Sequence, residues 1–427
     1  MSLQDYEKSM DSCIRCSHCK WIPFNKIQSK RFSENCPAIA KHNFHSYSGG
    51  GRVAIGRSLH QERSEITEEL METIYSCQLC GSCHVACHLI GEICEPLEIA
   101  RELRVKCVEE GEILPEHMLL IESMRKNDNP LGEPKETRGD WAEGLGLKNI
   151  NSDQVDVVFH AGCRYSYDAD LRHIVRGAAK LLLEAGVDVG IGGGEESCCG
   201  GRAFDIGFRG QMETCADDMM ARVKAAGATK VVTPCADCYG AFKQSYPMVQ
   251  KELGVEILHT TEYFAQLMRE GKIEPKGQGD LRVTYHDPCH LGRLGESYVP
   301  WDGEYKKVWG QVNVPDPPKQ VRRGVEGVYD EPRELVESVP GVELVEMERV
   351  REYSWCCGAG GGVKEAFEDF SEWTARERIE EAKSVGAEAI VTACGWCERN
   401  FKDALGNQDD EFKILDITEL LIGDEDE

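Results

Sequence analysis

Apolar residues in the first part of the chain recur at the spacing of a helix. Ile66, Leu70 and Ile74 lie at positions i, i+4 and i+8, and this pattern predicts a helix over residues 62–75. A second helix is predicted over residues 98–110. Both predicted helices fall among cysteine-rich stretches, so we expect them to support a metal-binding domain.

Strand patterns are absent from residues 1–120, and we predict an α-helical domain there. The polar segment 121–152 contains proline and glycine and is predicted to be a linker or a wrapping segment. From Val155 onward, strand and helix patterns alternate. The expected strands are 155–163, 187–191 and 230–234, and the expected helices are 170–184 and 211–226. This alternation predicts an α/β fold with a mostly parallel sheet and helices on its faces.

The second half of the chain repeats the first α/β pattern. VDVVFHAGC matches RVTYHDPC, CCGGRAF matches CCGAGGG, and VVTPCADCYGAF matches AIVTACGWCERNF. We predict two homologous α/β units with parallel sheets, over 153–275 and 276–427, that pack as pseudo-symmetric partners. The second unit contains an insertion, roughly 296–332, and the acidic tail 423–427 is expected to be solvated.

Composition narrows the function classes. A chain of 427 residues corresponds to about three domains. Acidic residues number 75 against 49 basic residues, and the net charge of −26 argues against nucleic acid and anionic membranes as partners. No apolar run approaches the ~18 residues of a membrane span, and the N-terminus is polar, unlike a secretory signal. We therefore predict a cytoplasmic protein without a transmembrane segment.

The sequence has 21 cysteines. Without a secretory signal, a disulfide framework is disfavoured, and metal binding or catalysis remains. Two C-x2-C-x2-C triplets lie in the helical domain, and such triplets are typical of ferredoxins with two [4Fe–4S] cubanes. Because the fourth ligand of each ferredoxin motif serves the other cluster, the predicted ligand sets are Cys13, Cys16, Cys19 and Cys87, and Cys77, Cys80, Cys83 and Cys36.

Two features depart from the ferredoxin pattern. Sixteen residues (20–35) separate Cys19 from Cys36 where three are usual. His88 follows Cys87 where proline is usual, and Cys94 is a rival of Cys87 as a ligand. The alternative for this domain is two zinc sites of four cysteines each, although zinc sites usually use paired C-x2-C motifs.

Each α/β unit has its own set of five cysteines. The sets are Cys163, Cys198, Cys199, Cys235 and Cys238, and Cys289, Cys356, Cys357, Cys394 and Cys397. Zinc and a simple cubane take four ligands, so five thiolates with one adjacent pair indicate a cluster of unusual shape. The alternatives are a strained disulfide between adjacent cysteines beside a C-x2-C redox pair, or zinc in one unit.

The double motif C-x34-CC-x35-C-x2-C and C-x66-CC-x36-C-x2-C resembles the paired CCG domains of heterodisulfide reductase. The N-terminal two-cubane domain resembles the D subunit of that family. This resemblance implies two non-cubane [4Fe–4S] clusters facing a pocket where a disulfide is reduced. The stretch CSHCKWIPF…RFSENCP…YSGGG is similar to an iron–sulfur subunit of class II benzoyl-CoA reductase complexes. The long gap in the second CCG motif leaves the pocket shape and the substrate open.

Two function classes follow. The first is an oxidoreductase subunit that reduces a disulfide or a similar acceptor, with His160 and His286 as candidate catalytic proton donors because histidine titrates near neutrality. The second is an electron-transfer conduit in a larger complex, such as a class II benzoyl-CoA reductase. For both histidines the alternative is packing at a strand end. Because no dinucleotide motif is evident, we predict a flavoprotein or iron–sulfur partner subunit as the electron donor in a complex of anaerobic metabolism.

Overall fold

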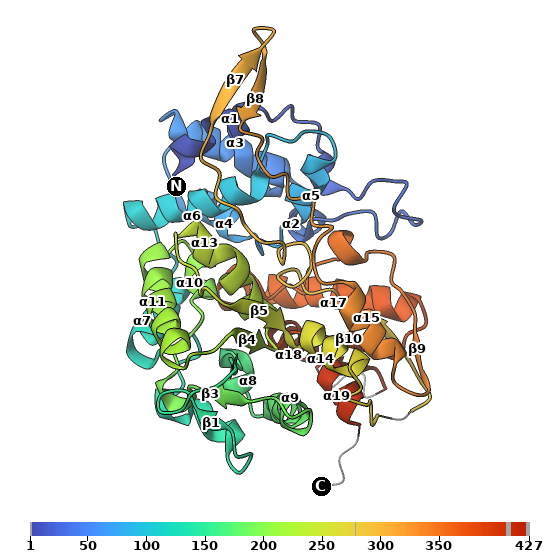
Figure 1. Ribbon diagram of the computed structural model, residues 1–427. Coiled ribbons are helices and arrows are strands. Elements are labelled where there is room, and N and C mark those ends of the chain that lie inside the picture. Colours follow the sequence, from blue (N-terminus) through green and yellow to red (C-terminus); the bar gives the residue numbers. More distant parts are fainter. Residues whose placement is uncertain (1, 278, 407–410, 424–427) are drawn as a thin grey trace.

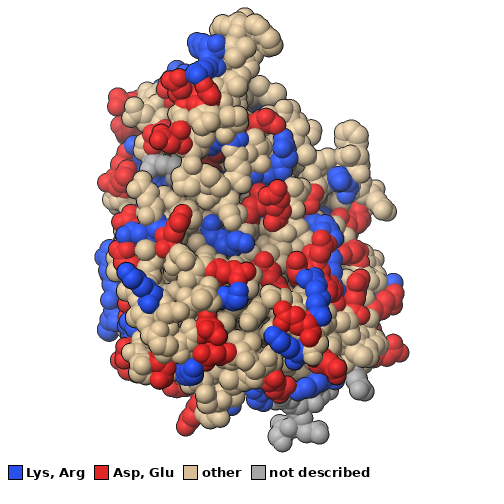
Figure 2. All heavy atoms as spheres, viewed as in Figure 1, with Lys and Arg blue, Asp and Glu red and all other residues tan. Residues whose placement is uncertain are grey.

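The computed structural model describes residues 2–277, 279–406 and 411–423. A helical domain lies at one end, and two α/β units lie side by side beneath it (Figure 1). No helix within the described ranges is long and apolar enough to cross a membrane. Residues 424–427 of the predicted solvated tail lie outside the described residues. On the face in Figure 2, acidic and basic side chains are interspersed.

The helical domain is built from short helices. Its elements are η1 Leu3–Tyr6, α1 Glu7–Asp11, η2 His18–Lys20, α2 Pro37–His42, η3 His45–Tyr47, α3 Gly49–His60, α4 Glu68–Tyr75, α5 Ser82–His88, α6 Pro96–Glu110 and α7 Pro115–Asn127. The helix predicted over 62–75 begins at Glu68, because the Thr67 hydroxyl accepts a hydrogen bond from the Leu70 amide and caps the helix there. The helix predicted over 98–110 begins slightly earlier, with Pro96 in its first turn.

The first α/β unit has a parallel sheet in the order β1-β3-β2-β4-β5. Its strands are β1 Lys148–Asn149, β2 Val157–Phe159, β3 Val189–Ile191, β4 Lys230–Thr233 and β5 Glu256–His259. Its helical elements are α8 Cys163–Tyr167, α9 Arg172–Glu184, η5 Gly193–Glu195, α10 Gly201–Asp205, α11 Arg209–Ala225, α12 Ala236–Gly240, η6 Ala241–Ser245, α13 Tyr246–Met248 and α14 Thr260–Arg269. The central strands β2 and β4 are buried, as expected of strands covered on both faces.

The second unit repeats this topology in a parallel sheet ordered β11-β10-β6-β9. Its strands are β6 Leu281–Tyr285, β9 Val342–Leu344, β10 Ala389–Thr392 and β11 Lys413–Asp416. Its helical elements are α15 Asp330–Glu337, η7 Arg351–Tyr353, α16 Val363–Ala366, α17 Glu368–Ser384, α18 Gly395–Leu405 and α19 Ile417–Ile422. The order matches β5-β4-β2-β3 of the first unit strand for strand. The predicted pair of α/β units with parallel sheets is therefore confirmed.

The segment 121–152 is more ordered than a simple linker. Helix α7 crosses residue 120, and its Ile121 and Met124 belong to the main hydrophobic core. The 3-10 helix η4 Lys135–Ala142 follows, and β1 pairs with β3 of the first sheet. This segment therefore wraps the first α/β unit.

The insertion in the second unit lies against the helical domain. It contains the antiparallel hairpin β7 Glu304–Val308 and β8 Val312–Asp316, which projects at the top of the view in Figure 1 and shares a pocket with Glu92 and Ile93. After the hairpin, Lys319 pairs with Glu95, and Arg322 pairs with the buried Glu98. Charge pairing thus holds the insertion on helix α6.

All three parts of the chain meet at Arg104 of α6, whose side chain is fully buried. Its guanidinium donates to five backbone carbonyl oxygens: those of Ile74, Tyr75 and Cys77 in the helical domain, Asp205 in the first unit and Gly361 in the second. Gly361 has φ +62°, and a Cβ there would lie 2.5 Å from the Cys77 oxygen. The glycine run therefore brings the second unit's backbone against the helical domain.

Candidate iron–sulfur sites

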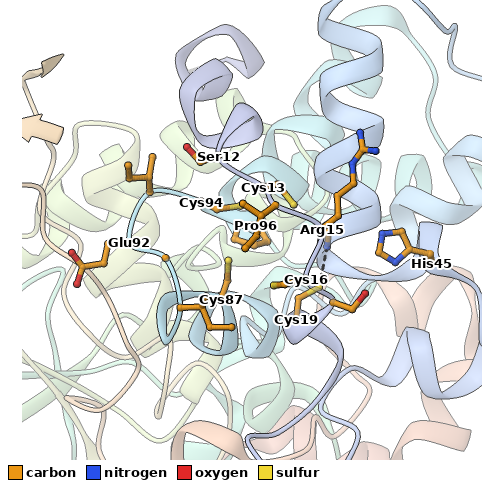
Figure 3. Close-up of a pocket in the computed structure, with 16 residues that line it drawn as sticks. Ser12, Cys13, Arg15, Cys16, Cys19, His45, Cys87, Glu92, Cys94 and Pro96 are labelled. Atoms are coloured by element: carbon orange, nitrogen blue, oxygen red, sulfur yellow. Dashed lines mark hydrogen bonds between the residues drawn. The ribbon is translucent and has the colours of Figure 1, made fainter. Parts of the chain in front are cut away.

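The first triplet of the helical domain lines an open cavity of about 220 Å³. Figure 3 shows Cys13, Cys16, Cys19, Cys87 and Cys94 around it. The backbone amide of Gly50 donates to the Cys19 sulfur at 3.3 Å, a contact that stabilises a negatively charged thiolate. The structure thus brings together the four cysteines predicted for the first cubane, with Cys94 as a fifth.

Cys94 lies between two of the predicted ligands. Its thiol is a hydrogen-bonding partner of both Cys13 and Cys87, and this contact lowers the pKa of Cys13 to about 6. The same two contacts raise the pKa of Cys94. The choice between Cys87 and Cys94 as the fourth ligand stays a prediction.

The second triplet lies beside Cys36. Cys36, Cys77, Cys80 and Cys83 line one small cavity at the base of the helical domain, next to Pro96 and Leu97. The residues 20–35 form a loop closed at its base, where Ile22 donates to the Ser33 oxygen at 2.9 Å and Asn35 donates to the Lys20 oxygen at 3.1 Å. This closed loop places Cys36 opposite the triplet that follows it in sequence.

The five cysteines of the first α/β unit lie at the carboxyl edge of its sheet. Cys163 begins α8 after β2, and Cys235 caps α12 after β4. Their thiols are neighbours in the order Cys163, Cys198, Cys199, Cys238 and Cys235. The amide of Gly200 also donates to the Cys198 sulfur at 3.4 Å.

The second unit repeats this arrangement. Its thiols are neighbours in the order Cys289, Cys356, Cys357, Cys397 and Cys394. The amide of Gly358 donates to the Cys356 sulfur at 3.3 Å, as Gly200 does in the first unit. All 21 cysteines are described and free of disulfides, so the chain shows no bond between the adjacent cysteines of either unit.

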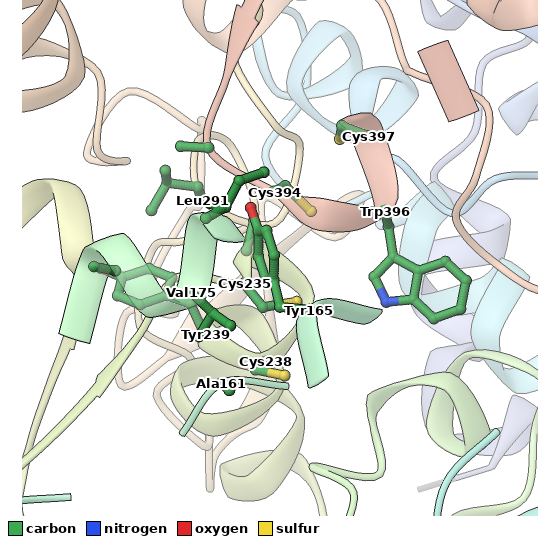
Figure 4. Packing of buried hydrophobic residues seen from close by; sticks show 14 of the residues in the cluster. Ala161, Tyr165, Val175, Cys235, Cys238, Tyr239, Leu291, Cys394, Trp396 and Cys397 are labelled. Carbon is green, nitrogen blue, oxygen red and sulfur yellow. The ribbon is translucent and has the colours of Figure 1, made fainter. Parts of the chain in front are cut away.

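The cysteine sets contact one another in a defined order. The thiol of Cys80 in the helical domain lies next to that of Cys356 in the second unit. The thiol of Cys394 in the second unit in turn lies next to that of Cys235 in the first unit. In Figure 4, the two C-x2-C pairs lie on neighbouring segments beside Tyr165 and Trp396. The helical domain therefore meets the second unit's cysteines, and these meet the first unit's cysteines.

The two candidate histidines lie in different surroundings. His160 is fully buried, and its Nδ1 lies 2.9 Å from a Glu196 carboxylate oxygen. His286 lies with Cys357 and Cys397, its nitrogen within 4.8 Å of both sulfurs. Burial lowers its pKa, and its Nδ1 accepts a hydrogen bond from Nε of Arg378 at 3.2 Å. A proton-donor role for either residue stays a prediction.

Buried charges that the sequence did not reveal surround the cysteines. Arg138 donates from Nη1 to the Cys163 sulfur at 3.4 Å, although it belongs to the segment 121–152. Arg293 is buried and donates to the backbone oxygens of Cys80 and Ser354. A single arginine in a polar segment belongs to no recognisable motif. The sequence alone therefore could not identify Arg138 as a neighbour of Cys163.

Side chains from both units also meet across their boundary. His290 of the second unit lies 2.7 Å from a carboxylate oxygen of Asp237 in the first. Arg202 of the first unit stacks on the ring of Trp396, which lies between Cys394 and Cys397. The insertion 296–332 also touches the first unit where it begins. The side-chain amide of Gln244 donates to the backbone oxygens of Glu296 and of Leu294, which precedes the insertion.

Family models agree with this architecture. The model described as "Cysteine-rich domain" (CCG) matches residues 157–243 and 319–402. The model described as "4Fe-4S dicluster domain" matches residues 9–89. The chain thus contains one dicluster domain and two cysteine-rich domains, which is the class of iron–sulfur protein that the cysteine sets predicted.

Curated relatives resemble the chain over nearly its full length. The D subunit of dihydromethanophenazine:CoB–CoM heterodisulfide reductase from Methanosarcina mazei is 29% identical, over 96% of this chain and 93% of the relative. EtfAB:quinone oxidoreductase from Syntrophomonas wolfei is 26% identical over 96% of this chain and 58% of its own length. The B subunit of fumarate reductase (CoM/CoB) from Methanothermobacter marburgensis is 26% identical, over 98% and 73% respectively. Over nearly its full length, the chain is thus similar to the D subunit of heterodisulfide reductase and to other iron–sulfur proteins of the oxidoreductase type.

Proposed function

We propose that this chain is an electron-transferring oxidoreductase subunit with two cubane [4Fe–4S] clusters and two non-cubane [4Fe–4S] clusters, which reduces a disulfide or a similar acceptor. The observation that carries the proposal is the unbroken order of contacts from Cys80 to Cys356 and from Cys394 to Cys235. Reduction of one disulfide takes two electrons and two protons and yields two thiols. When bound, such clusters supply single-electron transfer over potentials of roughly −700 to +450 mV.

The residues fit iron–sulfur clusters in donor chemistry. Each predicted set consists of thiols alone, the ligands that such clusters take. Backbone amides of Gly50, Gly200 and Gly358 donate to ligand sulfurs, which supports thiolates rather than thiols. Five cysteines in each α/β unit exceed what a zinc site uses.

Metal content tests this proposal. Two cubanes and two four-iron clusters require about sixteen irons per chain. Iron and zinc should be measured on anaerobically purified protein, together with acid-labile sulfide. About eight irons with zinc making up the difference would refute the paired non-cubane clusters.

We further propose that the cavity of the first triplet is where an electron-donating partner docks, either a flavoprotein or another iron–sulfur protein. Cys16 is exposed there, and the rim residues Ile14 and Ile90 are 75% and 51% exposed. Electron transfer weakens steeply with distance, so a donor must approach the outermost site. The net charge of −26 would steer a partner with basic groups toward the chain.

Substitutions at this rim test the docking face. Ile14→Glu and Ile90→Glu should each weaken the complex by about tenfold or more, since an apolar contact is replaced by a charge that resists desolvation. Leu119→Glu is the matched control, because Leu119 is 67% exposed on helix α7 and does not line the cavity. Native mass spectrometry of the anaerobically purified complex measures how much of the partner stays bound to each variant. Equal retention in rim and control variants would place the donor elsewhere.

A further inference from the structure

The wrapping segment 121–152 delivers a buried positive charge to the first five-cysteine set. Arg138 is 2% exposed, lies in η4, and donates from Nη1 to the Cys163 sulfur at 3.4 Å. We propose that Arg138 is a positioning residue that holds its charge on the Cys163 ligand and thereby raises the reduction potential of the first unit's cluster. This inference rests on the proposed function, which places a cluster at that set.

Glu196 fixes the orientation of Arg138. One Glu196 carboxylate oxygen accepts a hydrogen bond from Arg138 Nε at 3.0 Å and also lies 2.9 Å from Nδ1 of His160. The carboxylate thus anchors one side of the guanidinium, and the other side points at the sulfur. Because all three side chains are buried, their charges are poorly screened by water and act strongly at short range.

The direction of the effect follows from charge. Reduction adds an electron to a centre that already carries thiolates, and a nearby cation stabilises the more negative state. Arg138 therefore favours the reduced form, which corresponds to a higher potential. Removing Glu196 should act in the opposite sense to removing Arg138, since it leaves the cation less compensated.

The second unit provides an internal reference, because its surroundings differ. The position two residues before the paired cysteines is Ser354 there, where the first unit has Glu196. Arg378 donates to the Ser354 hydroxyl at 3.2 Å and to His286 Nδ1 at 3.2 Å. Arg378 thus contacts a histidine, whereas Arg138 contacts a cysteine of the first unit. Substitutions of Arg138 should therefore leave the reduction potential of the second unit's cluster unchanged.

A redox titration followed by electron paramagnetic resonance tests the inference, with the full chain in its purified complex. In Arg138→Gln, the first unit's ratio of reduced to oxidised cluster at a fixed potential should fall about tenfold, a shift of 59 mV for one electron. In Glu196→Gln the ratio should rise. The double variant Arg138→Gln/Glu196→Gln, which removes the buried pair together, should lie between the two. The second unit's signal should not move in any variant.

Each outcome of these titrations either supports or overturns the role proposed for Arg138. Iron-loaded single variants with unchanged potentials overturn the role of Arg138, and so do shifts in the same direction, which would indicate a general structural disturbance. If Arg138→Gln loses its iron, the comparison of Glu196→Gln with the double variant replaces it: the ratio of reduced to oxidised cluster should be lower in the double variant, and equal ratios would overturn the role of Arg138. Absence of a cluster from the first unit of the unsubstituted protein would refute the proposed function, and this inference with it.

Discussion

Replacing Cys199 by alanine should remove the iron held by the first α/β unit, about four of about sixteen atoms, and leave the other cluster signals in place. Cys199 is 5% exposed, and its thiol lies between those of Cys198 and Cys238. Loss of this thiol leaves an incomplete ligand set and a cavity that no neighbour fills. Iron analysis with electron paramagnetic resonance measures both effects.

Cys215→Ala is the matched control for Cys199→Ala. Cys215 is equally buried, on helix α11 of the same unit, but lies outside the predicted ligand set. Burial raises its pKa to about 12, so it remains a neutral thiol that packs as a small apolar residue. The control should keep all of its iron. Full iron content in Cys199→Ala, or equal loss in both variants, would contradict the ligand assignment.

Replacing Arg104 by leucine should lower the free energy of unfolding by about 3–5 kcal/mol, the cost typical of removing one partner from a buried charged network. Five carbonyl oxygens from all three parts of the chain would lose their donor. Arg104→Lys should recover only part of the loss, because an ammonium group has fewer donors than the guanidinium fork. Anaerobic denaturant unfolding of the iron-loaded protein measures the change.

Arg63→Leu serves as the control for Arg104→Leu, since it makes the same chemical change at an exposed position. Its effect should stay within about 0.5 kcal/mol. Limited proteolysis adds a second measurement, because the helical domain should become cleavable at lower protease concentration when its contact with both α/β units is weakened. Identical unfolding midpoints for the two leucine variants would refute a joining role for Arg104.

Much of the architecture could be predicted because short-range sequence patterns determine the helices and strands. Strand and helix periodicities identified the α/β alternation from Val155 onward, and the repeated cysteine motifs identified two homologous units. Backbone geometry follows from such short-range patterns, since burial of a strand or of one helix face sets the spacing of apolar residues. The boundaries were less accurate, because caps such as Thr67 decide where a helix begins.

The sequence by itself determined the cysteine sets, the repeated α/β units and the chemistry that thiols in those patterns support. Only the tertiary structure decided their order in space, in which the helical domain contacts the second unit's Cys356 although the first unit follows it in the chain. It also decided that Arg138 reaches Cys163 and that Arg104 joins three domains. These features depend on burial and charge pairing between residues far apart in sequence, and no local spacing records such contacts.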